Sequence, residues 1–246
     1  MASGRRAEWL LIVVLAPIAL CLLSVFLICR PYWIPTGSMK PGLLVGDYLL
    51  VNRAAYGFPA LMCKLSDCQL SMGPFGGLPE RGDVATFVHP KRDAHYIKRV
   101  IGLPGDTIEM QDGAPVLNGT PVPRDALPAF EEVYSLDDGA MRCSNAPVEL
   151  GALCKKDRAR EMLPGGASYA TLSLADGLRA DTAGPFTVPE GHVFVLGDNR
   201  DNSLDSRFPA EAGGIGFVPL ENMVGRAEII VFSLKGREGR VFKWVQ

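Results

Sequence analysis

The stretch "HYIKRVIGLPGD" (residues 95–106) decides what kind of fold the chain can form. Its β-branched residues predict a strand, and Pro104 with Gly105 predicts the turn that ends it. Because successive side chains of a strand point to opposite faces, Lys98 and Arg99 lie on opposite sides of the predicted sheet. If both faces of that sheet are covered, one of the two cations is buried, and its role needs an explanation.

The remaining composition favours a mainly β fold. The chain has 246 residues, a formal net charge of -2, 27 glycines and 19 prolines, and helical periodicity is scarce after the first thirty residues. This length allows a membrane anchor and one or two modest domains. The balanced charge argues against a nucleic-acid partner, because it implies no broad basic surface.

The N-terminal sequence predicts a single transmembrane helix over residues 9–29. That segment contains no charged residue and at about 1.5 Å per residue spans about 30 Å, the thickness of the bilayer core. The alternative is a cleaved secretory signal, but the apolar core of such a signal is usually about 7–15 residues and ends at a small-x-small site. Arg5 and Arg6 precede the segment, so residues 1–8 are predicted to form a cytoplasmic tail, with the remaining chain outside.

Four of the six cysteines lie outside the predicted helix in two close pairs. Cys63 and Cys68 form one pair, and Cys143 and Cys154 form the other. Neither pair has the Cys-x-x-Cys spacing of zinc or redox centres. If these residues lie outside the cytoplasm, a disulfide within each pair is possible, and four free thiols are the alternative.

Most common catalytic patterns are missing from the sequence. None of the three histidines has a recognisable catalytic setting, and the sequence has no G-x-S-x-G elbow, no H-E-x-x-H zinc motif and no phosphate-binding glycine loop. Residues 198–206, "DNRDNSLDS", superficially suggest a calcium loop, but Arg200 stands where an oxygen ligand is needed. We therefore expect no metal and no cofactor.

A candidate nucleophile remains in "IPTGSMKPGLLVGD", residues 34–47, which follows the predicted anchor closely. Ser38 comes after Gly37, which permits a sharp turn, and lies nine residues beyond the end of the anchor. A serine alone is weak evidence because most turn serines only bond their own backbone. With a lysine base it becomes stronger, since Ser-Lys pairs are a known variant of the catalytic triad.

The order of motifs resembles that of bacterial type I signal peptidases, which are membrane-anchored serine proteases with a Ser-Lys dyad. The matching segments are the N-terminal anchor, "PTGSMKPGLLVGD", "RGDVATF", "YIKRVIGLPGD", "GDNRDNSLDSR" and "GFVP". The sequence departs from the family pattern at Thr36, usually serine, at Gly42, usually threonine, and at residues 209–216, where the family normally continues with Trp-Gly.

The resemblance implies roles for individual residues. Ser38 would be the nucleophile, Lys98 the general base, and Ser203 the residue that hydrogen-bonds and orients the lysine. The Thr36 hydroxyl would join the Ser38 N–H in an oxyanion hole. The remaining implied residues are a structural ion pair and the lining of pockets for small side chains, namely Asp205 with Arg207, and Ile34, Leu43, Tyr96 and Ile97.

The resemblance also implies an architecture and an activity. Residues 30–106 and 188–246 would form an extracytoplasmic catalytic β domain, and residues 107–187 an inserted β-rich subdomain. The expected function is cleavage of signal peptides from exported precursors at the outer face of the cytoplasmic membrane. The expected partners are those precursors and the lipid bilayer. The alternatives are a Ser-Lys protease acting on regulatory membrane proteins and a non-catalytic membrane-anchored β domain that binds extracytoplasmic partners.

This mechanism makes a physical demand on Lys98. A lysine base must be neutral, yet the reference pKa of lysine is about 10.4, so activity near neutral pH needs a drop of roughly 3 units, or about 4 kcal/mol. Burial in apolar surroundings can supply such a shift. We therefore expect Lys98 to be the inward cation beside Ser38, and Arg99 to stay charged on the opposite face, in water or paired with a carboxylate.

Overall fold

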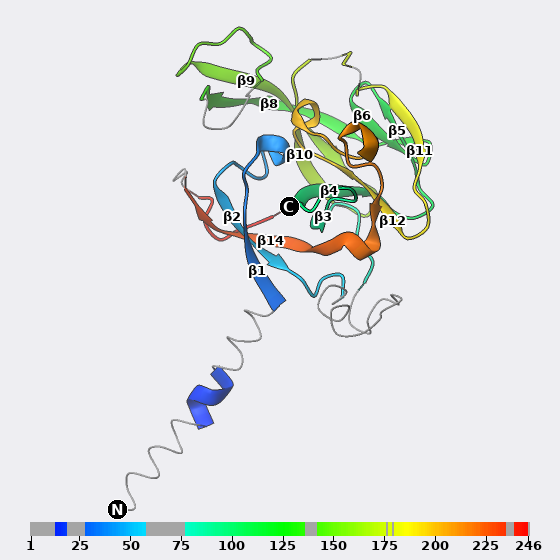
Figure 1. Ribbon diagram of the computed structural model, residues 1–246. Helices are drawn as coiled ribbons and strands as arrows, with labels where there is room; N and C mark the ends of the chain where they lie inside the picture. The colour runs from blue at the N-terminus through cyan, green and yellow to red at the C-terminus, as the bar shows by residue number, and fades with distance from the viewer. Residues whose placement is uncertain are drawn as a thin grey trace, which may run out of the picture.

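Strand β4 (His95–Gly102), which carries Lys98 and Arg99, lies within an eight-stranded sheet of the computed structural model (Figure 1). The structure describes residues 13–18, 28–57, 77–135, 142–175, 177–178, 180–234 and 239–245. The strand order is β1-β2-β14-β3-β4-β12-β13, with β15 paired to β14. The bounds of the other strands are β1 (Cys29–Trp33), β2 (Asp47–Asn52), β3 (Val84–Val88), β12 (His192–Leu196), β13 (Val218–Pro219), β14 (Met223–Ser233) and β15 (Lys243–Trp244).

Two smaller sheets follow β4 in the sequence. One has the order β11-β5-β6-β7 and the other β10-β9-β8. Their bounds are β5 (Thr107–Gln111), β6 (Ala114–Leu117), β7 (Thr120–Pro121), β8 (Arg124–Val133), β9 (Leu153–Met162), β10 (Ser168–Ser173) and β11 (Ala183–Thr187). The mainly β prediction is therefore confirmed. The division of the chain at residues 107 and 187 stays a prediction.

Short 3-10 helices complete the described elements. They are η1 (Gly37–Met39), η3 (Arg200–Asn202), η4 (Ala210–Ala212) and η5 (Leu220–Asn222). The first of them contains Ser38, and the second directly precedes Ser203. Both candidate serines therefore lie on tight turns between strands rather than within the sheet.

The two adjacent cations of β4 are both buried. Lys98 is 4 % exposed and Arg99 is 2 % exposed. Antiparallel pairing sets Ala85 of β3 opposite Lys98 and Val84 opposite Arg99. The sequence predicted one buried cation, whereas the fold covers both faces of the sheet. Each cation therefore needs its own compensation for the loss of water.

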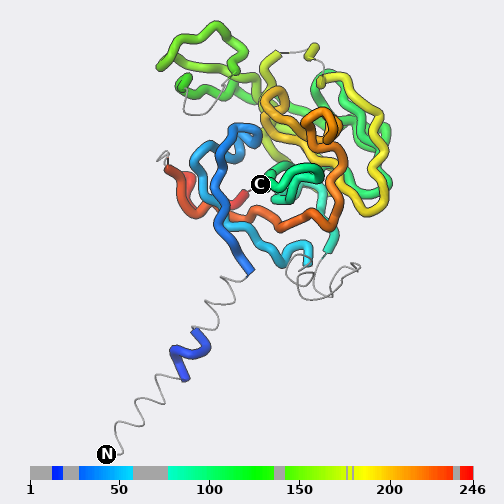
Figure 2. Tube along the Cα trace, in the orientation of Figure 1, coloured from blue at the N-terminus to red at the C-terminus, as the bar shows by residue number. Residues whose placement is uncertain are grey.

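A shared hydrophobic core joins the smaller sheets to the large one. It combines Ile101, Phe194 and Leu196 from the large sheet with buried residues of the following segment, namely Ile108, Met110, Leu117, Val122, Leu163, Tyr169 and Val188. The tube trace shows β8 and β9 extending from the side of the body opposite to the start of β1 (Figure 2). Through Tyr169, strand β10 belongs to the same core as Ile101 of β4.

The predicted transmembrane helix is only partly covered by the described residues. Residues 13–18 are helical, while residues 9–12 and 19–27 lie outside the described part of the chain. Among the described residues, no helix is long and apolar enough to span a bilayer. Cys29, the predicted last residue of the helix, instead begins β1, where it pairs with Asn52.

Candidate active site

The loop that carries Ser38 is fixed from both sides by backbone contacts. Ile34, before the loop, donates its N–H to the carbonyl of Asp47 at 2.9 Å. On the other side, Asn199 donates its backbone N–H to the Ser38 carbonyl at 3.0 Å and its side-chain amide to the Gly37 carbonyl at 2.9 Å. Ser38 itself is buried. Asn199, which the sequence did not single out, therefore holds the peptide groups on both sides of the Ser38 α-carbon.

Lys98 contacts the hydroxyl of Ser38 directly. Its Nζ donates to Ser38 Oγ at 2.8 Å and to the carbonyl of its neighbour Ile97 at 3.0 Å. Desolvation by burial lowers the pKa of Lys98 to about 8, although the carboxylates of Asp205 and Asp198 partly oppose this shift. Above that pH the amine is mostly neutral. A neutral amine in this position can accept the Ser38 proton rather than donate one of its own.

Ser203 lies in the same cavity but does not bond Lys98. Within the described part of the chain, its buried Oγ has no hydrogen-bond partner. The hydroxyl packs instead against Gly197, where an added Cβ would come within 2.2 Å of Ser203 Oγ and 2.7 Å of the Ser38 carbonyl oxygen. The structure thus differs from the predicted Ser203–Lys98 hydrogen bond.

Thr36 lies at the mouth of the site, beside the Ser38 hydroxyl. Its Oγ1 is 3.5 Å from Ser38 Oγ, and the residue is exposed. The hydroxyl is therefore accessible to a group that approaches Ser38 from solvent. The oxyanion-hole role of Thr36 stays a prediction.

A cavity of about 810 Å³ opens onto Ser38 and Lys98. Tyr96 and Ile97 contribute to its lining, and their role as substrate-pocket residues stays a prediction. The other lining residues are Pro35, Thr36, Gly37, His95, Arg142, Asp201, Asn202, Ser203, Leu204 and Phe208.

Ile34 and Leu43 occupy a different place from the one predicted. They are 2 % and 1 % exposed and belong to a core cluster with Leu49 and Val51 rather than to the lining of this cavity. The side chains pack inward because the loop around Ser38 folds over the large sheet. They pack in the core beneath this loop, and their role in a substrate pocket stays a prediction.

The predicted ion pair between Asp205 and Arg207 is present and wholly buried. Arg207 Nε donates to Asp205 Oδ1 at 2.8 Å and a terminal nitrogen donates to Oδ2 at 2.9 Å. Asp205 also accepts the N–H of Gly197 at 3.1 Å. The pair therefore stabilises the turn that brings Gly197 against the Ser38 loop.

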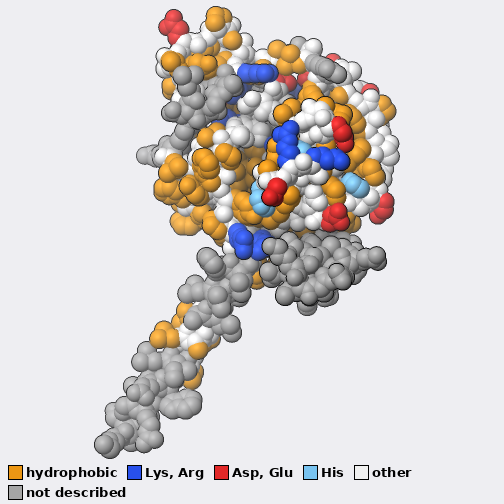
Figure 3. Space-filling view, in the orientation of Figure 1, with side chains coloured by type: hydrophobic (Ala, Val, Ile, Leu, Met, Phe, Trp, Pro, Cys, Tyr) orange, Lys and Arg blue, Asp and Glu red, His pale blue; other side chains and the backbone are white. Residues whose placement is uncertain are grey.

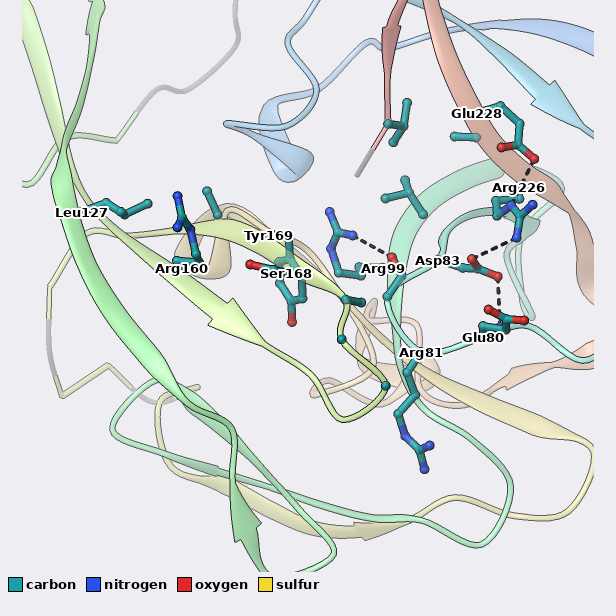
Figure 4. Close-up of a pocket in the computed structure, with 18 of the residues that line it drawn as sticks. Glu80, Arg81, Asp83, Arg99, Leu127, Arg160, Ser168, Tyr169, Arg226 and Glu228 are labelled. Atoms are coloured by element: carbon teal, nitrogen blue, oxygen red, sulfur yellow. Dashed lines mark hydrogen bonds and ion pairs between the residues drawn. The ribbon is translucent and has the colours of Figure 1, made fainter.

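Arg99 on the opposite face forms a bidentate ion pair with Asp198. The two N–H···O distances are 2.8 and 2.7 Å, and the guanidinium carbon lies 4.0 Å from the centre of the Tyr169 ring. Burial alone would lower the pKa of Arg99, but the Asp198 carboxylate raises it, so the cation stays charged. Figure 4 shows Arg99 and Tyr169 in a separate cleft between the large sheet and β9–β10, with Arg160 on the other wall.

A second buried cluster connects the Ser38 loop to β8 and β9. Lys40 Nζ donates to Glu132 Oε2 at 2.6 Å, and Lys156 Nζ donates to Glu132 Oε1 at 2.9 Å. All three side chains are at most 4 % exposed. No local sequence pattern predicts this cluster, because Lys40 and Glu132 are 92 positions apart.

A disulfide joins Cys143 to Cys154, with the two Cα atoms 5.2 Å apart. Cys63 and Cys68, the other predicted pair, lie outside the described residues. Cys29 is a free thiol. Across the described ranges, no group of three or more His, Cys, Asp or Glu side chains is arranged to hold a metal ion.

Comparisons with known proteins agree on one family. A family model described as signal peptidase, peptidase S26, matches residues 6–232. The signal peptidase I of Rickettsia typhi is 37 % identical over 227 residues, which cover 89 % of this chain and 77 % of that protein. The Rickettsia akari signal peptidase I is 36 % identical over the same lengths. The crystal structure of a signal peptidase I from Enterococcus faecalis is 25 % identical, covers 61 % of this chain and 97 % of that chain, and has a TM-score of 0.32.

Proposed function

Because the chain belongs to the signal peptidase family, peptidase S26, we propose that it cleaves signal peptides from exported precursors with Ser38 as nucleophile and Lys98 as general base. Members of this family named signal peptidase I are serine endopeptidases, and this chain is one as well. The observation that carries the proposed dyad is the 2.8 Å contact between Lys98 Nζ and Ser38 Oγ in a buried site.

The proposed reaction uses the proton affinity of the buried amine. Neutral Lys98 takes the Ser38 proton as Oγ attacks the scissile carbonyl. The Ser38 N–H and the Thr36 hydroxyl stabilise the oxyanion, and each such donor is typically worth about 3 kcal/mol. The lysine ammonium then protonates the leaving amine, and water hydrolyses the acyl-enzyme by the same route. Ser203 would support Lys98 from the cavity wall by rotating its unpartnered hydroxyl toward the amine.

The strand pairing supports binding of an extended substrate. β12 pairs with β4 only from Arg99 onward, so within the described sheet residues 95–98 have β3 on one side and the cavity on the other. The free edge of a strand offers unpaired backbone groups to an added peptide strand. A precursor segment lying along this edge would bring its scissile carbonyl to Ser38, which Lys98 contacts from the same strand.

An exposed apolar surface supports attachment to a bilayer. Trp33, Phe232, Phe242 and Trp244 are each more than half exposed on or beside β1, β14 and β15. Figure 3 shows hydrophobic side chains gathered on this part of the body. Tryptophan is enriched where proteins meet the membrane interface. We propose that residues 9–29 cross the cytoplasmic membrane, that residues 1–8 are cytoplasmic, and that the cavity lies at the outer face.

The function is tested with a purified exported precursor and the full chain reconstituted in lipid vesicles. We expect cleavage when Ala precedes the scissile bond, and a fall in kcat/KM of at least about tenfold when that Ala is replaced by Leu, because extra methylenes do not fit beside Tyr96 and Ile97. Mass spectrometry of the product gives the cleavage position. An Ala→Leu change deep in the mature part is the matched control, and equal cleavage of both precursors would contradict the pocket assignment.

The pH dependence tests the state of Lys98 separately. Its lowered pKa of about 8 means that the neutral base is the minor form at pH 6 and the major form at pH 9. We therefore expect kcat/KM to rise about tenfold per pH unit below pH 8 and to level off above it. The measurement uses a peptide substrate without titratable side chains near the cut. A rate that stays constant or falls between pH 6 and pH 8 would be incompatible with a lysine base.

A further inference from the structure

Arg142 brings an unexpected cation to the cavity that holds Ser38 and Lys98. Arg142 lines that cavity although it is far in sequence from both Ser38 and Lys98. It lies 12 residues before Cys154 of β9. Its side chain is exposed and makes no hydrogen bond or ion pair with the described residues. An arginine is always charged at working pH and presents several donors in a planar fork that matches a carboxylate. Its guanidinium is therefore free to bind a substrate group.

The backbone beside Arg142 is held firmly on β9. Cys143 forms the disulfide with Cys154. Ser144 donates both its N–H and its hydroxyl to the Lys155 carbonyl, at 2.8 and 2.9 Å. Asn145 accepts the Lys155 N–H at 2.8 Å through its side chain. A covalent bond and three hydrogen bonds in three consecutive residues therefore fix the position from which Arg142 extends.

The β8–β9 ribbon is in turn fixed relative to Ser38. Glu132 of β8 and Lys156 of β9 form the buried cluster with Lys40, two residues after the nucleophile. Arg142 thus reaches the cavity from a support that is tied to the nucleophile loop itself. Such a support positions a side chain at a constant distance from the reacting bond, which is what substrate recognition requires.

The direction of the chain indicates which part of a substrate Arg142 would meet. β1 leads toward Ser38, and β8–β9 lie on the far side of the body from the start of β1 (Figure 1). A precursor that leaves the bilayer next to residues 9–29 reaches Ser38 with its signal peptide on the membrane side. Its mature part then extends toward β9, and so toward Arg142.

The other charged or titratable side chains that line the cavity away from Lys98 are Asp201 and His95. Asp201 also lines the cavity, but its Oδ2 accepts the Ser173 hydroxyl at 3.0 Å and the Leu174 N–H at 2.7 Å. His95 lies at the start of β4, and the centre of its ring is 5.5 Å from the centre of the Tyr32 ring of β1. Arg142 is accordingly the cation that a substrate side chain can reach on the far side of Ser38.

We propose that Arg142 recognises an acidic side chain among the first residues after the scissile bond. This inference rests on the proposed function and adds a specificity for the mature part of the precursor. The ligand class is a carboxylate of Asp or Glu in an extended chain, bound by the guanidinium in the substrate complex. The Cys143–Cys154 disulfide acts by holding the segment from which this guanidinium extends.

The test uses precursors that differ only in having Glu, Gln or Lys at one of the first three positions after the cut. For at least one position we expect wild-type kcat/KM to be about five- to tenfold higher with Glu than with Lys, because charge reversal replaces an attraction by a repulsion. In Arg142→Gln this ratio should fall to within about twofold of one, and Arg142→Glu should invert it. Arg142→Lys should keep the preference for Glu in weakened form.

Arg160→Gln is the matched control. Arg160 is an exposed arginine of strand β9, but it lines the separate cleft shown in Figure 4, so the ratio should stay at the wild-type value. A Glu-to-Lys ratio that is near one in wild type, or that is unchanged in Arg142→Gln, would overturn the inference. Cleavage of the Gln precursor by wild type measures the proposed function independently of either result.

Discussion

Replacing Lys98 by Arg is expected to lower kcat/KM for precursor cleavage by about a thousandfold or more. Arginine keeps the positive charge and much of the length, but it cannot give up its proton at working pH. The Ser38 hydroxyl, which now lies 2.8 Å from an amine with a pKa of about 8, would then face a permanent cation. Ser38→Ala should cause a loss of the same order, and the double variant should be no worse because the two groups act as one unit.

The matched control for this prediction is Lys91→Arg. Lys91 is an exposed lysine whose Nζ lies 3.8 Å from Glu211, so the same substitution there should leave kcat/KM within about twofold of wild type. Single-turnover cleavage of one precursor by each variant gives the comparison, and near-ultraviolet circular dichroism reports whether the variants are folded. Substantial cleavage by folded Lys98→Arg would refute the dyad.

Removing the partner of Arg99 is expected to cause the largest loss of stability. Asp198→Ala should reduce the free energy of unfolding by about 3–5 kcal/mol, because it leaves a buried guanidinium without its carboxylate. Both side chains are 2 % exposed, so water cannot replace the lost partner. Denaturant titration in detergent, followed by tryptophan fluorescence, measures the change.

A surface ion pair provides the comparison for Asp198→Ala. Glu131 and Lys155 lie 2.9 Å apart on β8 and β9, with side chains about half exposed, and Glu131→Ala should cost less than about 1 kcal/mol. The double variant Asp198→Ala/Arg99→Met should recover part of the lost stability, since neither position of this pair then carries a buried charge. A change below 1 kcal/mol in Asp198→Ala would show that the Arg99 pair does not stabilise the fold as argued.

The sequence predicted the parts of the site that depend on strand alternation and motif order. Alternation along residues 95–102 places Lys98 and Arg99 on opposite faces of the sheet. The motif around Ser38 identifies the candidate nucleophile for which Lys98 is the candidate base. The β-rich composition likewise predicted the fold class. These features are local, so they can be derived without knowing which segments meet in space.

Contacts between distant segments were beyond the reach of the sequence. Arg99 was expected in water or beside a carboxylate, but its burial depends on β10, which brings Tyr169 over its guanidinium. Leu43 was assigned to a pocket from the resemblance, yet the fold of the Ser38 loop places it in the core. Arg142 lines the cavity beside a disulfide between two separate segments, and its position next to Cys143 was the one signal available in the sequence.

The pairing of β3 with β4 has a consequence for how the enzyme matures. Val84 lies opposite Arg99 and Ala85 opposite Lys98, and a slip of one residue would turn every side chain of β4 to the other face. A slipped molecule would present a guanidinium to Ser38 and an amine to Asp198, so it would be inert even if it were as compact as the native one. The specific activity of a preparation therefore measures the fraction of molecules in which β3 and β4 pair in the native register. The yield of a refolding experiment can be determined from the rate of cleavage alone.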